Sequence, residues 1–171
     1  MDIMYQPIGF FRTPFGQIEG MPIQPIGGGN VEGIIEVLPE FIMGLRDLEG
    51  FSHVFVLYHL HKIEGYELSI KPFLDNKKHG VFATRSPKRP NPIGLSVMKL
   101  KNICNRYVFL EGIDVLDHTP VLDIKPYVAD FDLCDANRFG WFEGKSRNAV
   151  FHRSDGRFAP QPQPQTETIG I

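Results

Sequence analysis

Short apolar runs, separated by glycine and proline, follow one another along most of this chain. In several of these runs apolar and polar side chains alternate, which is the pattern of a half-buried β-strand. Leu95 and Val97, for example, point to one side of one run, and Ser96 and Met98 point to the other. The pattern favours β structure over long helices. The runs that predict strands are YQPIGFFRT, VEGIIEVL, FSHVFVLYHL, HGVFAT, GLSVMKLKNI and RYVFLEGIDVL.

The segments between the runs predict how the strands are connected. Residues 104–107, CNRY, are expected to form the tight turn of a hairpin. One helix is expected in LPEFIMGLRDLEGF, where Pro39 can open the first turn and Gly50 can close the last. We therefore expect an all-β protein with minor α content. One sheet of six or more short strands closes into a β-barrel, with one short helix and an irregular C-terminal tail.

Length and composition place these strands in one soluble domain. The 171 residues are 42% apolar and 22% charged, which is ordinary for a single folded domain. We expect the barrel domain to span residues 1–137 and a C-terminal extension to span 138–171, disordered from about residue 158 onward. No stretch reads as a secretory signal or a membrane helix, so the expected location is the cytoplasm, with no membrane partner.

Charge and residue spacing argue against several function classes. A formal net charge of −2 gives no overall field that attracts nucleic acid, so a polyanion has to be bound by a local patch. Cys104 and Cys134 lack CxxC spacing, which argues against a disulfide scaffold or a thiolate zinc site. His53, His59 and His61 share a strand face, but without an HExxH pattern we expect no metal site. Without a GxSxG pattern, serine hydrolase chemistry is weakly supported.

The most unusual stretch is VFATRSPKRPNPIGLSV, residues 81–97, in which three prolines separate cationic and amide side chains. Proline fixes its own φ and pushes the preceding residue toward extended backbone. Arg85, Lys88, Arg89 and Asn91 therefore lose less entropy when they bind a ligand. Arginine binds carboxylates and phosphates with a bidentate fork. The stretch predicts either a preformed anion-binding loop or an ordinary basic turn.

A second unusual stretch, GIDVLDHTPVLDIKPYVADFD, spans residues 112–132. Its turn, DHTP, contains side chains that bond neighbouring backbone amides. In the strand VLDIKPY that follows, Asp123, Lys125 and Tyr127 fall on one face. This polar triplet is either an Asp–Lys ion pair on a solvated face or part of a pocket shared with the Arg85 loop. Because sites are usually built from loops at strand ends, the pocket is favoured.

Together, the two stretches resemble the most distinctive motifs of the TrmO (YaeB, VirR) family of tRNA methyltransferases. The stretches that carry the resemblance are FATRSPKRPNPIGLS and LDHTPVLDIKPY. Three further stretches fall in the family's order and spacing: GFFRTPF, PIQP and GLRDLEGFSHVFVLYHLH. The similarity covers roughly residues 5–130.

The resemblance implies a small β-barrel methyltransferase that binds S-adenosylmethionine at a homodimer interface. It implies methyl transfer to N6 of threonylcarbamoyl-adenosine at position 37 of a threonine tRNA. Two alternatives stay open: a regulatory module that binds S-adenosylmethionine without transferring its methyl group, and a methyltransferase with a different substrate.

The resemblance implies the cofactor contacts by position in the matching motifs, and residue type and placement suggest the catalytic and substrate candidates. For the chemistry, Asp123 and Tyr127 are candidates to orient the base or take its proton, and Lys125 is a candidate phosphate or carboxylate contact. Lys88, Arg89 and Asn91 are the expected contacts for the substrate RNA or for the partner subunit. The expected cofactor contacts are Gln24, Pro25, His61, Lys62, Arg85, Leu95, Asp117, His118, Thr119 and Pro120.

The chain departs from the family pattern in three places. Ile23 stands where an arginine is frequent, and His118 stands where glycine is frequent. Bacterial members carry an additional C-terminal domain, whereas this chain has a short extension. That extension contains a basic cluster that reads either as a phosphate contact or as a solvated terminal segment. The cluster consists of Arg138, Lys145, Arg147, Arg153 and Arg157.

Overall fold

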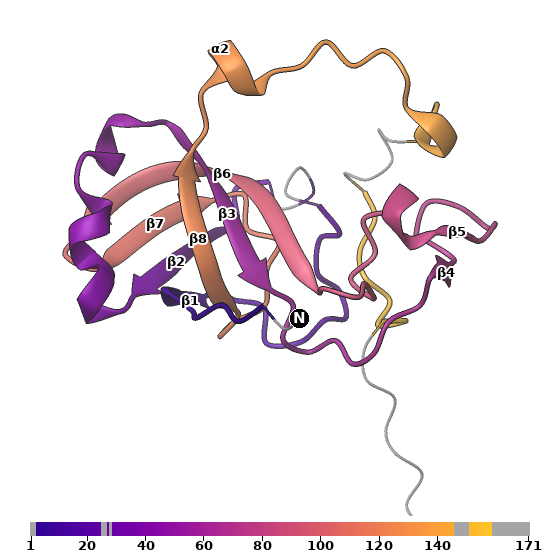
Figure 1. Cartoon of the computed structure of the whole chain (residues 1–171), viewed down its shortest axis with the longest axis horizontal. Helices are drawn as coiled ribbons and strands as arrows, with labels where there is room; N and C mark the ends of the chain where they lie inside the picture. Colours follow the sequence, from indigo (N-terminus) through magenta and orange to yellow (C-terminus); the bar gives the residue numbers. More distant parts are fainter. Residues whose placement is uncertain (1–2, 25–26, 28, 146–150, 159–171) are drawn as a thin grey trace, which may run out of the picture.

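The computed structural model describes residues 3–24, 27, 29–145 and 151–158, and its main feature is a closed antiparallel β-barrel (Figure 1). The strands pair in the order β1-β2-β7-β6-β3-β8, and β8 pairs back with β1. The prediction of one closed sheet is confirmed. The barrel strands are β1 (Gly9–Arg12), β2 (Glu32–Val37), β3 (His53–His59), β6 (Ile93–Cys104), β7 (Tyr107–Glu111) and β8 (Pro120–Pro126).

The interior of the barrel is filled by the apolar residues that alternation assigns to one face. On β3, Val54, Val56 and Tyr58 are buried, whereas the residues between them are only partly buried. Phe11 from β1 and Met98 from β6 are also fully buried in this core. Burying each side chain of this size stabilises the fold by about 1.5–3 kcal/mol. Because the interior is packed, a ligand has to bind at the rim or on the outside of the barrel.

The two predicted connections are present. β6 ends at Cys104, β7 begins at Tyr107, and Asn105 between them has a φ of 55°, which asparagine tolerates well. The predicted helix is present as two short 3-10 helices, η1 (Pro39–Leu45) and η2 (Leu48–Gly50). They are separated where Asp47 takes a left-handed φ of 65°. Buried Leu45 anchors this segment on the barrel core at the left in Figure 1.

A smaller lobe lies beside the barrel, at the right in Figure 1. It contains the two-stranded sheet of β4 (Ser69–Ile70) and β5 (His79–Gly80), followed by the 3-10 helix η3 (Val81–Ala83). Ile70, Val81 and Phe158 form its small core. The prediction of a strand over HGVFAT was therefore wrong beyond Gly80. The run RYVFLEGIDVL also leaves the sheet after Glu111, because Gly112 takes a φ of 88°.

The chain after β8 arches from the top of the barrel to the smaller lobe (Figure 1). It forms α2 (Ala129–Asp132) and η4 (Gly140–Phe142) on the way. Trp141 attaches this segment to the smaller lobe: its Nε1 donates to the carbonyl oxygen of Ala83 at 2.7 Å, and its ring stacks on His79. Lys145 forms an ion pair with Asp75 at 2.9 Å in the same lobe. The predicted domain boundary at 137 stays a prediction, and the predicted disordered tail beyond Phe158 lies outside the described residues.

Two further properties concern the described residues only. None of their helices is long and apolar enough to cross a membrane. No group of three or more of their histidine, cysteine, aspartate and glutamate side chains is arranged to hold a metal ion.

Candidate functional site

A cavity of about 1030 Å³ lies between the barrel and the smaller lobe. Its walls come from β3, from the beginning of β6, from the loop before β2 and from the loop that follows η3. The C-terminal segment that includes η4 contributes a further wall. Most of the exposed lining is apolar, and its size matches a site for a cofactor or a comparable small molecule.

The loop that carries Arg85 is held by its own side chains. Thr84 Oγ1 donates to the carbonyl of Val81 at 2.8 Å and accepts from the amide of Ser86 at 3.2 Å. The guanidinium of Arg89 donates to the carbonyls of Thr84 and Val81 at 3.0 and 3.3 Å. The predicted stiffness therefore has a second source besides proline: buried hydroxyls and one cation brace the backbone from inside.

Within this braced loop, Arg85 is the exposed cation of the cavity wall. Its Nη1 donates to Oε1 of Gln24 at 2.6 Å, although the two residues are 61 positions apart in sequence. The Gln24 amide also donates to the carbonyl of Ile23 at 2.7 Å. This contact joins the PIQP loop to the Arg85 loop and places a guanidinium where it can meet a carboxylate.

On another side of the cavity, His61 faces the DHTP turn, residues 117–120. Its Nδ1 lies 3.3 Å from Oγ1 of buried Thr119. Burial, together with the positive charge of nearby Lys62, lowers the pKa of His61. The imidazole is therefore neutral at physiological pH and offers one donor and one acceptor.

The structure brings most of the predicted cofactor residues to this one cavity, but not all of them. Pro25 lies outside the described residues. Asp117 instead accepts from the amide of Thr13 at 3.1 Å and so holds the DHTP turn against β1. His118 is exposed, with a φ of 59° and a 2.6 Å contact to Arg12, and Pro120 begins β8. Those that line the cavity are Gln24, His61, Lys62, Arg85, Leu95 and Thr119.

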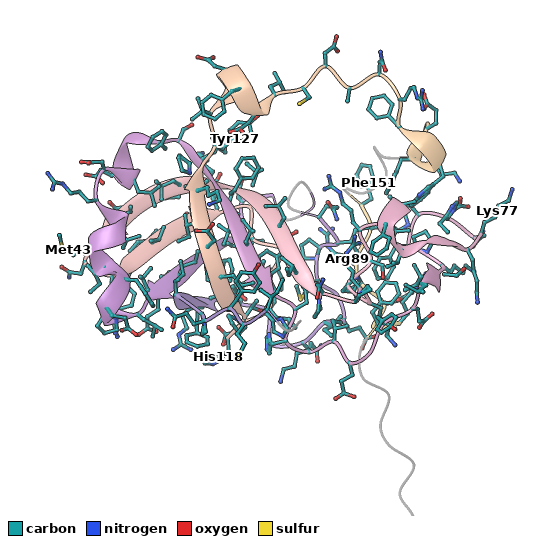
Figure 2. All side chains as sticks on the ribbon, in the orientation of Figure 1. Met43, Lys77, Arg89, His118, Tyr127 and Phe151 are labelled. Carbon is teal, nitrogen blue, oxygen red and sulfur yellow. The ribbon has the colours of Figure 1, made fainter. Side chains whose placement is uncertain are left out.

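The polar triplet of β8 lies elsewhere. Asp123 and Lys125 form an ion pair at 2.6 Å with both side chains well exposed, which matches the solvated-face interpretation. Tyr127 packs edge-on against Phe55, and Figure 2 shows it at the opposite end of the barrel from His118. None of the three lines the cavity, so the expected pocket with the Arg85 loop is not formed. The reason is the strand order, which puts β3 between β8 and β6. Their catalytic role stays a prediction.

The predicted substrate residues also differ from one another. Lys88 forms an ion pair with Glu67 at 3.6 Å, and Asn91 is exposed on the same loop. Arg89, labelled in Figure 2, lines the cavity, yet its guanidinium donates to backbone carbonyls of η3 and of its own loop. Arg89 is thus a brace for the Arg85 loop, whereas Lys88, which is partly buried, and Asn91, which is exposed, do not line the cavity.

Sequence reasoning missed Asp114, the acidic residue of the cavity wall. Its Oδ1 accepts from Oγ of Ser96 at 2.9 Å, and Ser96 Oγ lies 3.0 Å from the hydroxyl of buried Tyr58. Burial raises the pKa of Asp114 to about 7, and the Ser96 hydrogen bond and nearby Arg85 offset only part of that rise. The signal in the sequence is a single aspartate between two apolar residues, Ile113 and Val115, both of which are buried. The pattern of this run predicts only a strand.

Fold and cavity together define a class: a small β-barrel protein with a cation-bearing site for a mixed polar and apolar ligand. Comparison with known proteins then identifies the family. Residues 10–133 match the sequence model described as the tRNA-methyltransferase O N-terminal domain. The chain belongs to this family.

Three relatives illustrate the similarity. A Pyrococcus abyssi protein named "Probable S-adenosyl-L-methionine-binding protein" is 45% identical over 91% of this chain and 85% of its own length. The mouse tRNA (adenine(37)-N6)-methyltransferase is 39% identical over 77% of this chain but only 32% of its own length. A crystal structure of TrmO from Pseudomonas aeruginosa superposes with a TM-score of 0.69 and 38% identity, covering 82% of this chain and 63% of that one.

Proposed function

We propose that this protein is an S-adenosylmethionine-dependent methyltransferase that methylates N6 of the adenine at position 37 of tRNA. Family membership and the names of the archaeal and mammalian relatives support the cofactor and the reaction. The observation that carries the proposal is the gathering of six predicted cofactor residues around one cavity, although the sequence spreads them over residues 24–119. A tRNA substrate is consistent with activity in the cytoplasm.

The residues of the cavity fit S-adenosylmethionine group by group. Arg85 supplies the cation that the cofactor's carboxylate requires, and Gln24 fixes the direction of that guanidinium. Leu60, Ile63 and Leu95 supply apolar wall for an adenine ring. When bound, the cofactor supplies an electrophilic methyl group on a sulfonium. The work of the protein is then to align an amine with that methyl group, and a braced loop reduces the entropy lost in doing so.

We propose threonylcarbamoyl-adenosine of a threonine tRNA as the specific substrate. That nucleoside carries a free carboxylate, and Lys62 and Arg138 are further cations on the cavity wall that suit it. Lys88 and Asn91, on the outer side of the same loop, are the proposed contacts for tRNA phosphates. Arg89 contributes indirectly, through the loop that it braces.

We also propose that the active form is a homodimer. Ile93, Leu95 and Val97 are large apolar residues on the outer face of β6 that line the cavity and stay exposed. A second copy that covers this row would exclude water from the site and complete its wall. Sedimentation of the full chain tests this directly, and a monomer at micromolar concentration would contradict it.

The experiment for the proposed function is transfer of a labelled methyl group to threonylcarbamoylated tRNA. Arg85→Ala should raise the dissociation constant for S-adenosylmethionine about 10–100-fold, since a charge-assisted hydrogen bond contributes about 1.5–3 kcal/mol. Arg46→Ala, which removes an exposed cation outside the cavity, is the matched control. Tight cofactor binding without any transfer to a competent tRNA would favour the regulatory-module alternative.

A further inference from the structure

The cavity holds one carboxyl group among several cations. Asp114 is the only acidic side chain of the described residues that line it. Facing the same space are Arg85 and Arg89 from the loop after η3 and His61 and Lys62 from the segment after β3. Arg138, from the C-terminal segment, faces it too, so four of these five side chains, all but the neutral His61, are cations. Burying a carboxyl group destabilises the folded state unless other interactions offset the lost hydration. A single partly buried carboxyl in this cavity therefore suggests a functional role.

Asp114 is held by a short chain of hydroxyl groups from two adjacent strands. Ser96 on β6 donates to its Oδ1 at 2.9 Å, so the hydroxyl of Tyr58 on β3 supplies the proton in its own 3.0 Å contact with Ser96. Burial and the charge of Asp114 raise the pKa of Tyr58, which keeps that phenol a neutral donor. The chain Tyr58 to Ser96 to Asp114 thus fixes one carboxylate oxygen and its orientation.

A glycine leaves room for the Tyr58 ring in this chain of hydroxyl groups. Gly94 lies on β6 beside the Tyr58 ring, and a Cβ at that position would come within 2.1 Å of the ring. Glycine therefore permits the phenol to lie flat against the strand and reach Ser96. Two buried hydroxyls and one glycine are consequently committed to positioning the Asp114 carboxyl at the cavity wall.

On the basis of the proposed function, we propose that Asp114 accepts the proton that N6 loses during methyl transfer, with Ser96 and Tyr58 as positioning residues. In this step the N6–methyl bond forms while the sulfur–methyl bond breaks. The electron pair of the broken bond stays on sulfur, which becomes a neutral thioether. The N6 proton passes to the Asp114 carboxylate, which becomes a carboxylic acid, so atoms and charge balance.

Three observations favour Asp114 over the other candidate bases. A general base works best when its pKa lies near the working pH, and burial raises the pKa of Asp114 to about 7. Asp123, the alternative carboxyl, is paired with Lys125 on the outer surface and does not line the cavity. His61 is the second-best candidate, but its Nδ1 already faces Thr119.

The test compares single-turnover methyl transfer by the full chain and its variants between about pH 5.5 and pH 9. Asp114→Asn should slow transfer about 10²–10⁴-fold and abolish the rise of rate with pH, whereas Asp114→Glu should restore part of both. Ser96→Ala removes a hydrogen bond that lowers the pKa of Asp114. In this variant the increase of transfer rate with pH should therefore occur at higher pH. If Asp114→Asn does not fold, the pH profile of Ser96→Ala still tests the inference. In Asp114→Asn and in Ser96→Ala, the affinity for S-adenosylmethionine, measured by calorimetry, should change less than about threefold.

Two results would overturn this inference while leaving the proposed function intact. One is a folded Asp114→Asn variant that transfers methyl at the unaltered rate with the unaltered pH dependence. The other is a variant that loses cofactor affinity but keeps the pH dependence at saturating cofactor, which would make Asp114 a cofactor contact. Absence of transfer by the unaltered protein would instead overturn the proposed function and this inference with it.

Discussion

Replacing Asp114 with asparagine should make the folded protein more stable, even as it impairs the proposed reaction. Burial raises the pKa of this carboxyl from its ordinary value of 3.8 to about 7. The folded state therefore holds a proton that the unfolded chain has already released, and stability is lost as pH rises from about 4 through about 7. With 1.36 kcal/mol for each pKa unit, the loss is at most about 4 kcal/mol, complete above the folded-state pKa.

Urea unfolding of the unaltered protein and of Asp114→Asn tests this magnitude. Asparagine keeps the size of the side chain and an acceptor for Ser96 but has no charge to desolvate. The free energy of unfolding of the variant, relative to the unaltered protein, should rise by about 2–3 kcal/mol between about pH 5 and pH 8. Asp47→Asn, on an exposed left-handed residue that asparagine tolerates, is the control and should change stability by less than about 0.5 kcal/mol at both pH values. A difference for Asp114→Asn that does not vary with pH would refute the reasoning.

Two substitutions test the supports of the site. Gly94→Ala should destabilise the fold by about 1–3 kcal/mol, because the added Cβ overlaps the ring of Tyr58. Gly44→Ala is the control, because a Cβ at that position meets nothing within 4 Å. Equal urea midpoints for the two variants would contradict this prediction. Arg89→Ala should cost about 1.5–3 kcal/mol of stability, since its charged group donates to backbone carbonyls. It should also weaken S-adenosylmethionine binding, because the loop of Arg85 becomes less rigid. Unchanged affinity by calorimetry would contradict the role of Arg89 in stabilising that loop.

The barrel could be predicted from the sequence because its strands are long enough to show alternation. On β6, for instance, alternation places Ser96 and Met98 on one face and Leu95 and Val97 on the other, and the structure buries the first pair and exposes the second. The smaller lobe could not be predicted, because strands of two residues have no period to detect. The run HGVFAT looked like a strand from composition, but Val81 turns inward to a small core completed by Phe158, which is 77 residues away. Such long-range packing leaves no local pattern.

The candidate site was half predicted for a similar reason. Arg85 belongs to a loop of unusual composition and Gln24 to a stretch that carries the family resemblance, so each could be singled out before their contact was known. The DHTP turn was also singled out, but the structure uses Asp117 to hold the turn rather than to line the cavity. Asp114 has no motif around it, and its surroundings depend on register, since the pairing of β3 with β6 brings Tyr58 to Ser96, which in turn donates to Asp114. Strand register is a property of the closed sheet and is not visible in one short run.

The measurement that tests the central claim most directly is the identity of the methylated product. The full chain is incubated with threonylcarbamoylated threonine tRNA and S-adenosylmethionine that carries a deuterated methyl group, and the nucleosides are analysed by mass spectrometry. The account predicts the label on N6 of threonylcarbamoyl-adenosine at position 37, and its loss with Arg85→Ala but not with Arg46→Ala. Label on another nucleoside, or none on a tRNA that a known methyltransferase of this class does modify, would contradict it.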